Sequence, residues 1–237
     1  MRLLILTTDT PHHSFFIREL AVTYPQLHAI VESTGLSPSF DVHHPFEEER
    51  DSYERRVWFN GVQIAMRELA ETFVCENINQ PECIAHISEL HPDVTVVFGT
   101  RKLSPPVIEA AGVNIINLHG GDPEYYRGLD SHLWAIYHGD YSSLVATLHT
   151  VNEALDDGEI VGIRPIPLAR DMKLHELRRR NTECALRLTV DAIEDLVRSG
   201  VMPSRAQRQN GRYYSFMPTV LKVLCVKKFE RYCANLK

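Results

Sequence analysis

Short, nearly continuous apolar runs are the feature that most limits what this chain can fold into. Four of them, over residues 2–8, 26–31, 94–98 and 113–118, each have the length of one strand. Strands in a parallel sheet are buried on both faces, so they read as continuous apolar runs. From Pro11 the sequence between the first two runs has helical spacing. The pattern therefore predicts an α/β protein with a mostly parallel sheet flanked by helices.

The rest of the chain supplies further segments of both kinds. We expect a surface loop over 32–45, a charged helix over 46–71, strands over 72–75, 144–151 and 159–168, helices over 81–90, 104–112 and 130–138, and a helix over 174–199 that ends at Gly200. Ser104 and Asp130 are the expected N-caps of their helices. Asn210-Gly211 is typical of a hairpin turn. We therefore expect a main domain over 1–200 and a small C-terminal extension over 201–237, a hairpin or helix suited to a dimer contact.

Composition narrows the class of protein. The 237 residues are 44% hydrophobic and carry a formal net charge of -6, which argues against a nucleic-acid binder in general. No signal peptide and no apolar stretch of about 20 residues is present, so we expect no membrane partner. The five cysteines form no CxxC pair, which is typical of reduced thiols in a cytoplasmic protein.

Polar side chains follow the fourth apolar run at the point where a strand ends. Asn117 and His119 stand there, and a loop with Pro123 and Tyr126-Arg127-Gly128 comes next. His149 lies on a later predicted strand, seven positions before Asp156 in an acidic turn. Open α/β sheets build their sites at the carboxyl ends of strands, so this stretch is the candidate site.

This arrangement resembles the folate-dependent formyltransferases, a family that includes glycinamide ribonucleotide transformylase, methionyl-tRNA formyltransferase and the sugar N-formyltransferases. The resemblance covers residues 75–168 well and implies a Rossmann-like domain. It also implies transfer of a formyl group from the co-substrate 10-formyltetrahydrofolate to a primary amine. By motif position, the resemblance makes Asn117, His119 and Asp156 the catalytic residues.

The residue types suit that reaction independently of the family name. The amide of Asn117 can donate a hydrogen bond to a developing oxyanion. His119 can exchange protons or carry transient positive charge near neutral pH. Asp156 can orient an imidazole or a water and take up the proton of the amine. Each residue taken alone has an ordinary structural explanation, and only their combination with the Tyr-Arg-Gly loop points to catalysis.

The resemblance also implies which residues bind the folate. They are Phe98, Gly99, Thr100 and Arg101 at one strand end, and His149, Val151, Asn152 and Ala154 on the other side. Backbone groups of the first segment would contact the pterin, so the side chain of Arg101 is only a candidate. His149 is equally well explained as a buried strand histidine with a satisfied hydrogen bond.

The acceptor is inferred from features in which this chain differs from particular members of the family. The first predicted strand is not followed by the glycine-rich phosphate loop of glycinamide ribonucleotide transformylase, and the chain is shorter than methionyl-tRNA formyltransferase. It is therefore most similar to the sugar N-formyltransferases of polysaccharide synthesis, which act on nucleotide-linked amino sugars. His12, His13, Tyr126 and Arg127 are the candidate substrate-binding residues, together with the helix over 46–56. A structural role in pinning the loop is favoured for Arg127, and a plain helix start explains His12 and His13 equally well.

Four alternatives stay open. His12, His13, His43 and His44 are clustered, but they lack the spacing of a metal site, so we expect no metal. The chain is alternatively a catalytically silent module that binds folate or a nucleotide sugar. Its basic segment from Arg205 to Lys237 would suit RNA, although such charges usually face solvent. The acceptor is alternatively glycinamide ribonucleotide or an amino acid.

Overall fold

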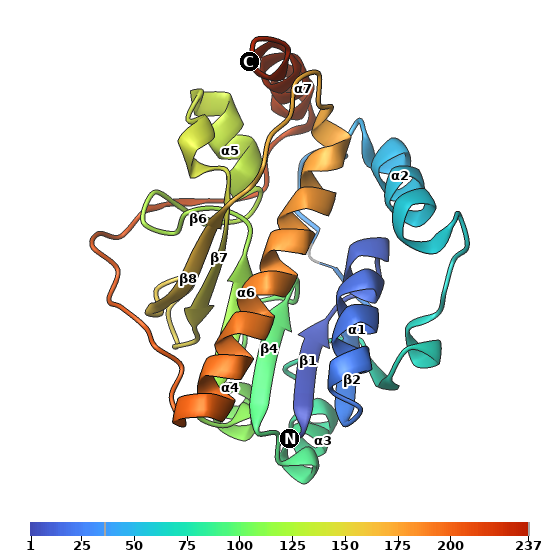
Figure 1. Cartoon of the computed structure of the whole chain (residues 1–237), viewed down its shortest axis with the longest axis vertical. Coiled ribbons are helices and arrows are strands. Elements are labelled where there is room, and N and C mark those ends of the chain that lie inside the picture. The colour runs from blue at the N-terminus through green and yellow to red at the C-terminus, as the bar shows by residue number, and fades with distance from the viewer. Residues whose placement is uncertain (36, 237) are drawn as a thin grey trace.

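A seven-stranded sheet forms the centre of the computed structural model, which describes residues 1–35 and 37–236. The strand order is β3-β2-β1-β4-β5-β7-β8, with parallel pairing from β3 to β5 and antiparallel pairing of β7 and β8 (Figure 1). The strands are β1 (Leu3–Thr7), β2 (Leu27–Glu32), β3 (Glu71–Cys75), β4 (Val94–Phe98), β5 (Ile115–His119), β7 (Val145–Thr150) and β8 (Ile160–Pro165). The predicted mostly parallel α/β sheet is confirmed.

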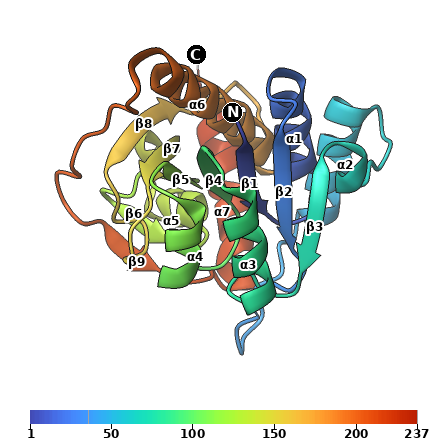
Figure 2. The same cartoon turned by 90° about the horizontal axis from the view of Figure 1, so that it is seen from below.

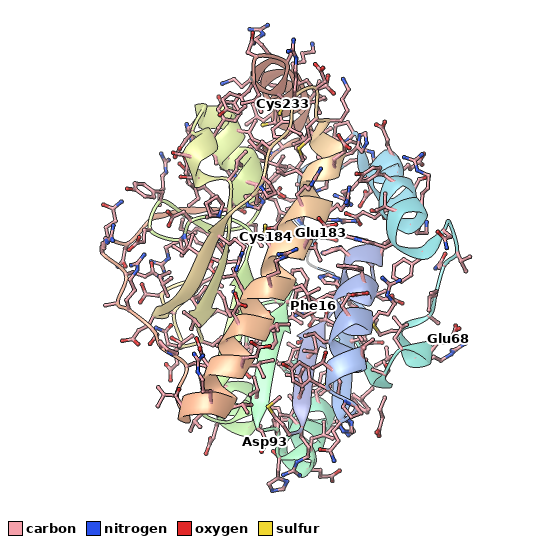
Figure 3. The ribbon with its side chains drawn as sticks, viewed as in Figure 1. Phe16, Glu68, Asp93, Glu183, Cys184 and Cys233 are labelled. Carbon is pink, nitrogen blue, oxygen red and sulfur yellow. The ribbon has the colours of Figure 1, made fainter. Side chains whose placement is uncertain are left out.

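Helices cover both faces of this sheet. Helices α1 (Pro11–Thr23) and α6 (Leu177–Ser199) lie on one face, and α3 (Pro81–Leu90) and α4 (Pro105–Ala111) lie on the other (Figure 2). The alternation of β1 explains this arrangement: Leu3 and Ile5 contact the core under α1 and α6, whereas Leu4 and Leu6 contact the core under α3 and α4. Phe16 of α1 and Cys184 of α6 belong to the first of these cores (Figure 3).

The remaining elements gather beyond the carboxyl ends of the parallel strands. They are α2 (Glu47–Phe59), β6 (Tyr126–Gly128), α5 (Ser131–His138), β9 (Arg212–Tyr214), α7 (Thr219–Ala234) and short 3-10 turns at Tyr141–Ser143 and Leu174–Glu176. A further 3-10 turn at Met66–Glu68 lies just before β3, toward the other end of the sheet. Phe229 and Cys233 of α7 are fully buried in a separate apolar core shared with α5. Figure 3 places Cys233 at this end of the molecule, opposite Asp93. The C-terminal segment therefore packs onto the same end of the sheet as the predicted site.

Two sequence predictions are wrong. The helix predicted over 46–71 ends at Phe59, because Asn60 (φ 52°) and Gly61 (φ 83°) both adopt the left-handed conformation that terminates a helix. Asn210-Gly211 forms no hairpin. Instead β9 pairs in parallel with the distant β6, and the amide of Gly211 donates to the Pro123 carbonyl over 3.1 Å.

The two predicted side-chain caps are also wrong, although both helices are present. Ser104 stands at the start of α4 without capping it. Asp130 precedes α5 at φ 52°, and its carboxylate accepts a hydrogen bond from the amide of Met217 over 2.8 Å instead. Tertiary contacts thus replaced the local ones that the sequence favoured. Within the described residues no helix has the length and apolarity needed to cross a membrane.

Candidate functional site

Asn117, His119 and Asp156 meet in a cavity of about 440 Å³ at the carboxyl end of β5. The first two side chains leave β5 two positions apart, so they point to the same face of the strand. Asp156 arrives from the turn between β7 and β8, next to β5 in the sheet. The topology thus brings together residues almost 40 positions apart in the chain.

The hydrogen bonds of His149 fix the orientation of Asn117. Nδ1 of His149 lies 2.8 Å from the Thr150 carbonyl oxygen, which only accepts, so Nδ1 carries the proton. In the neutral ring Nε2 therefore accepts, and it lies 3.0 Å from the amide nitrogen of Asn117. This contact uses one hydrogen of the Asn117 amide group and leaves the other available to a ligand in the cavity.

His119 faces Asp156 with its other ring nitrogen. Its Nε2 donates to the Tyr126 carbonyl over 2.8 Å, so a neutral His119 presents the Nδ1 lone pair to Oδ2 of Asp156 at 3.6 Å. A lone pair facing a carboxylate is unfavourable, whereas a protonated ring or a bridging water makes the contact favourable. The pair is therefore built to accept a proton at Nδ1.

Asp156 is held as a carboxylate despite its burial. Burial by itself raises the pKa of Asp156, but His119 and the amide of Gly128 lower it by more, so the net shift is downward. The Gly128 amide donates to Oδ2 over 2.7 Å, and His149 Nε2 lies 3.4 Å from Oδ1. Asp156 itself adopts φ 51°, a left-handed conformation that aspartate tolerates better than most residues.

One side of the cavity is formed by strand ends and loops of the sheet. We call it the strand-end wall; its members are Phe98, Gly99, Thr100, Arg101, Val151, Asn152 and Ala154. All seven were singled out from the sequence. The guanidinium of Arg101, however, is committed to the protein, because its Nε donates to buried Glu32 over 2.5 Å and its Nη2 to the Thr34 carbonyl over 2.6 Å.

Much of the rest of the lining is formed by helices and the loop before α2, and it meets the strand-end wall where His12 and His13 pack on Phe98. We call it the helical wall; its members are His12, His13, His44, Phe46, Arg50, Arg178 and Asn181. His12 and His13 thus reach the cavity, as the sequence predicted. Burial and the charge of Arg178 lower the pKa of His13 to about 3, and burial and His13 lower that of His12, so both rings are neutral near pH 7.

Tyr126 and Arg127 do not reach the cavity with their side chains. The hydroxyl of Tyr126 donates to Asp140 over 3.2 Å, away from the site. Arg127 donates to the Leu155 carbonyl from Nε over 3.0 Å and lies 3.4 Å from the carboxylate of Asp157. Both residues hold the loops that position His119 and Asp156, and the favoured structural role of Arg127 fits these contacts. Their binding of substrate stays a prediction.

The sequence missed four residues of the site. Arg178 and Asn181 of α6 line the cavity, as do His44 and His132, yet all four lie outside the motif. Nε2 of His132 donates to the Val145 carbonyl over 2.8 Å, and burial lowers the pKa of His132 to about 4. Only the spacing of Arg178 and Asn181 gave a weak indication that they act together, because the two positions share one face of the predicted helix.

Histidines 12, 13, 43 and 44 do not assemble into a metal site. Within residues 1–35 and 37–236 no group of three or more His, Cys, Asp or Glu side chains is placed to hold an ion. His12 and His13 bond to threonine hydroxyls, with Thr10 Oγ1 at 2.7 Å and 2.9 Å from their Nδ1 atoms. His44 contacts Lys222 instead, with its Nε2 3.0 Å from the ammonium nitrogen.

Several solved structures are similar to this chain. A sugar N-formyltransferase from Shewanella has a TM-score of 0.63 at 17% identity, with 97% of this chain and 87% of that chain covered. PseJ from Anoxybacillus kamchatkensis, a formyltransferase solved with UDP-4,6-dideoxy-4-formamido-L-AltNAc and tetrahydrofolate, has a TM-score of 0.55 at 17% identity over 91% of this chain and 86% of PseJ. HypX from Aquifex aeolicus, solved with tetrahydrofolic acid, has a TM-score of 0.58 at 20% identity. The match covers 97% of this chain but only 34% of HypX.

These structural similarities show a shared fold. The family is shown by a match of the sequence itself. A family model described as "Formyl transferase" matches residues 51–193. The matched segment is more than half of the 237 residues and contains Asn117, His119 and Asp156. The chain therefore belongs to the formyl transferase family.

Proposed function

We propose that this protein transfers a formyl group from 10-formyltetrahydrofolate to the primary amine of a nucleotide-linked amino sugar. The observation that carries the proposal is the meeting of Asn117, His119 and Asp156 in one cavity of a formyl transferase family member. PseJ and HypX, which share the fold, were solved with tetrahydrofolate, and this supports the choice of donor.

The strand-end wall fits a folate. Backbone groups of 98–101 and 151–154 would supply its polar contacts, while Val97, Leu103 and Leu155 add apolar lining beside them. A flat heteroaromatic ring with hydrogen-bonding edges suits such a slot. When bound there, 10-formyltetrahydrofolate would supply the formyl group to be transferred.

Asn117 is proposed to stabilise the negative charge that develops on the formyl oxygen. Its amide already donates one hydrogen to His149, which fixes the plane of the group and directs the second hydrogen into the cavity. A donor that is held in place before the reaction costs no reorganisation during it, and removal of such a donor typically costs a few kcal/mol of transition-state stabilisation. His149 acts through Asn117 and is proposed as a positioning residue.

His119 and Asp156 are proposed to manage the proton of the attacking amine. A carboxylate with a strongly lowered pKa is a poor long-term proton acceptor but stabilises nearby positive charge well. We therefore assign the proton to Nδ1 of His119, directly or through a water, with Asp156 stabilising both the imidazolium and the amine. Burial of both side chains strengthens this interaction.

The acceptor is the finer part of the proposal. The likeness to sugar N-formyltransferases supports an amino sugar, and glycinamide ribonucleotide or an amino acid is the alternative. We also propose a role in polysaccharide synthesis, a cytoplasmic location and a homodimer. We further propose that the chain divides into a domain over residues 1–200 and an extension over 201–237. We propose no membrane or nucleic-acid partner.

The proposal is tested by incubating the protein with 10-formyltetrahydrofolate and a panel of nucleotide-linked amino sugars. We expect one acceptor to gain the mass of a formyl group and tetrahydrofolate to be released in equal amount. Transfer to glycinamide ribonucleotide or an amino acid alone would overturn the acceptor and keep the chemistry. Failure with every amine, despite folate binding, would favour a silent binding module.

A further inference from the structure

Two arginines lie together in the helical wall with part of each guanidinium unused. Arg50 comes from α2 and Arg178 from α6, and both line the cavity. Nε of Arg50 and Nη2 of Arg178 contact the same carboxylate oxygen, Oδ1 of Asp51, over 3.2 Å and 2.6 Å. Sharing one oxygen places the two guanidinium groups side by side.

The carboxylates that hold these arginines leave one edge of each open. Arg50 uses Nε for Asp51 and Nη2 for Glu47, and Arg178 uses Nε and Nη2 for Glu54 and Asp51. Across the described part of the chain, neither Nη1 has a hydrogen-bond partner. Both arginines line the cavity, whereas none of the three carboxylates that hold them does.

His44 belongs to the same wall and is held there by Lys222. The ammonium of Lys222 only donates, so Nε2 of His44, 3.0 Å away, accepts and Nδ1 carries the proton in the neutral ring. Burial and the charge of Lys222 lower the pKa of His44 to about 4, which keeps it in that form. Nδ1 is buried and has no partner among the described residues. An atom enclosed to this degree is not exposed to the cavity, so His44 supports the wall through Lys222 and offers no donor to a ligand.

We infer that Arg50 and Arg178 form an anion-binding site that selects acceptors carrying a phosphate or carboxylate group. Guanidinium groups held from behind by carboxylates match the oxygens of such anions, because their planar N–H edges are already oriented. The carboxylate of Asp130, which also lines the cavity, is occupied by Lys222 Nζ at 3.2 Å and the Met217 amide. The inference rests on the proposed function and adds a specificity-determining pair to it.

The first test is binding of inorganic pyrophosphate, measured by calorimetry without folate or amine. The wild-type protein should bind it, and Arg50→Gln should weaken binding at least about tenfold, equivalent to about 1.4 kcal/mol. Arg67→Gln, at an exposed position outside both α2 and the cavity lining, is the matched control and should bind like wild type. Arg178→Lys keeps a positive charge beside buried Glu54, and it should weaken pyrophosphate binding because lysine lacks the planar guanidinium group. Thermal unfolding confirms that each variant is folded.

The second test compares three simple acceptor amines in the transfer assay: phosphoethanolamine, β-alanine and ethanolamine. The two anionic amines should react better than the neutral one, and the better of them identifies phosphate or carboxylate as the preferred group. Pyrophosphate should compete with the acceptor and not with the folate. Failure of all transfer together with Arg50-dependent pyrophosphate binding would reject the proposed function and keep the anion site. Equal use of the neutral amine, or pyrophosphate binding unaffected in both arginine variants, would overturn the inference.

Discussion

The two walls of the cavity are built in different ways. The strand-end wall consists of the end of β4 and of short segments that directly follow β4 and β7, so its members stand at neighbouring positions in the chain. The helical wall is assembled from α1, the loop before α2, α2 and α6, and charged contacts across more than 100 residues hold it together. The first wall depends on the sheet, whereas the second depends on side chains that meet only after folding. Changes to each wall should therefore have separable effects.

The largest expected effect is the loss of kcat when Asn117 or Asp156, which belong to neither wall, is replaced. Asn117→Ala and Asp156→Asn should each lower kcat by about 10²–10³, because each removes a group that acts on developing charge. Asn114→Ala and Asp191→Asn are the matched controls, since neither residue lines the cavity. Steady-state kinetics and thermal unfolding separate lost chemistry from lost structure. A wild-type kcat in both Asn117→Ala and Asp156→Asn would contradict the assignment of these residues to the active site.

Lys222→Met should damage the helical wall alone. The fully buried ammonium contacts the Val42 carbonyl, His44 and Asp130, and so ties α7 to the loop that carries His44. Removal of one partner from such a buried pair typically costs about 3 kcal/mol. Denaturant unfolding should show this loss, and KM should rise for the acceptor with little change for the folate.

Lys227→Met on the same helix is the control, because Lys227 is exposed. It should leave the free energy of unfolding and both KM values unchanged. Equal rises in both KM values for Lys222→Met would show that the walls are not separable.

Gly99→Ala should damage the strand-end wall. Gly99 has φ +88°, and a Cβ there would lie 2.7 Å from Nε2 of His13. We expect a loss of about 1–2 kcal/mol in stability and a higher KM for the folate. Gly139→Ala carries the same backbone strain, at φ +76°, without any atom within 4 Å of the new Cβ. A folate KM that rises equally in both variants would exclude a specific effect on the wall.

The smallest expected effect is on stability in mild acid. Burial lowers the pKa of His13 to about 3 and that of His132 to about 4, from 6.5. Below pH 6.5 the unfolded chain binds protons that the folded protein excludes, so stability falls with pH until those lower values are reached. Each histidine should cost about 1 kcal/mol at pH 5.5, and about 2–4 °C of Tm is lost per kcal/mol in a chain of this size.

The pH dependence is checked by comparing wild type with His132→Gln between pH 7.5 and 5.5. The glutamine amide can donate to the Val145 carbonyl in place of Nε2, so the variant should lose less Tm on acidification. His91→Asn, at an exposed left-handed position, should follow wild type. A His132→Gln profile parallel to that of wild type would assign the acid sensitivity to other groups.

The sequence predicted the strand-end wall well and the helical wall poorly, for a physical reason. Strands and the loops that follow them are fixed by local apolar patterning, so Phe98–Arg101, Asn117 and His119 could be placed from the sequence. The role of Arg178 depends on contacts with Asp51 and Glu54, which lie more than 120 residues away in the chain. No local pattern encodes such a contact.

The errors in the fold have the same origin. Asp130 has the residue type of an N-cap, yet the Met217 amide and Lys222 engage its carboxylate after α7 docks. Asn210-Gly211 favours a hairpin locally, but the backbone of 123–125 offers partners that place β9 beside β6 instead. In both cases a tertiary contact outweighs a local preference. The end of α2 is different, because Asn60-Gly61 is a local sequence signal for the end of a helix that the prediction did not use.

The most direct test of the account is a single-turnover experiment with 10-formyltetrahydrofolate and the best acceptor of the panel. Release of tetrahydrofolate and formylation of the amine are followed together in wild type, Asn117→Ala and Asp156→Asn. The account predicts stoichiometric release and formylation in wild type, only when the acceptor is present, and near-complete loss in both variants while folate still binds. Tetrahydrofolate release without a formylated amine, or transfer that survives in both variants, would contradict it.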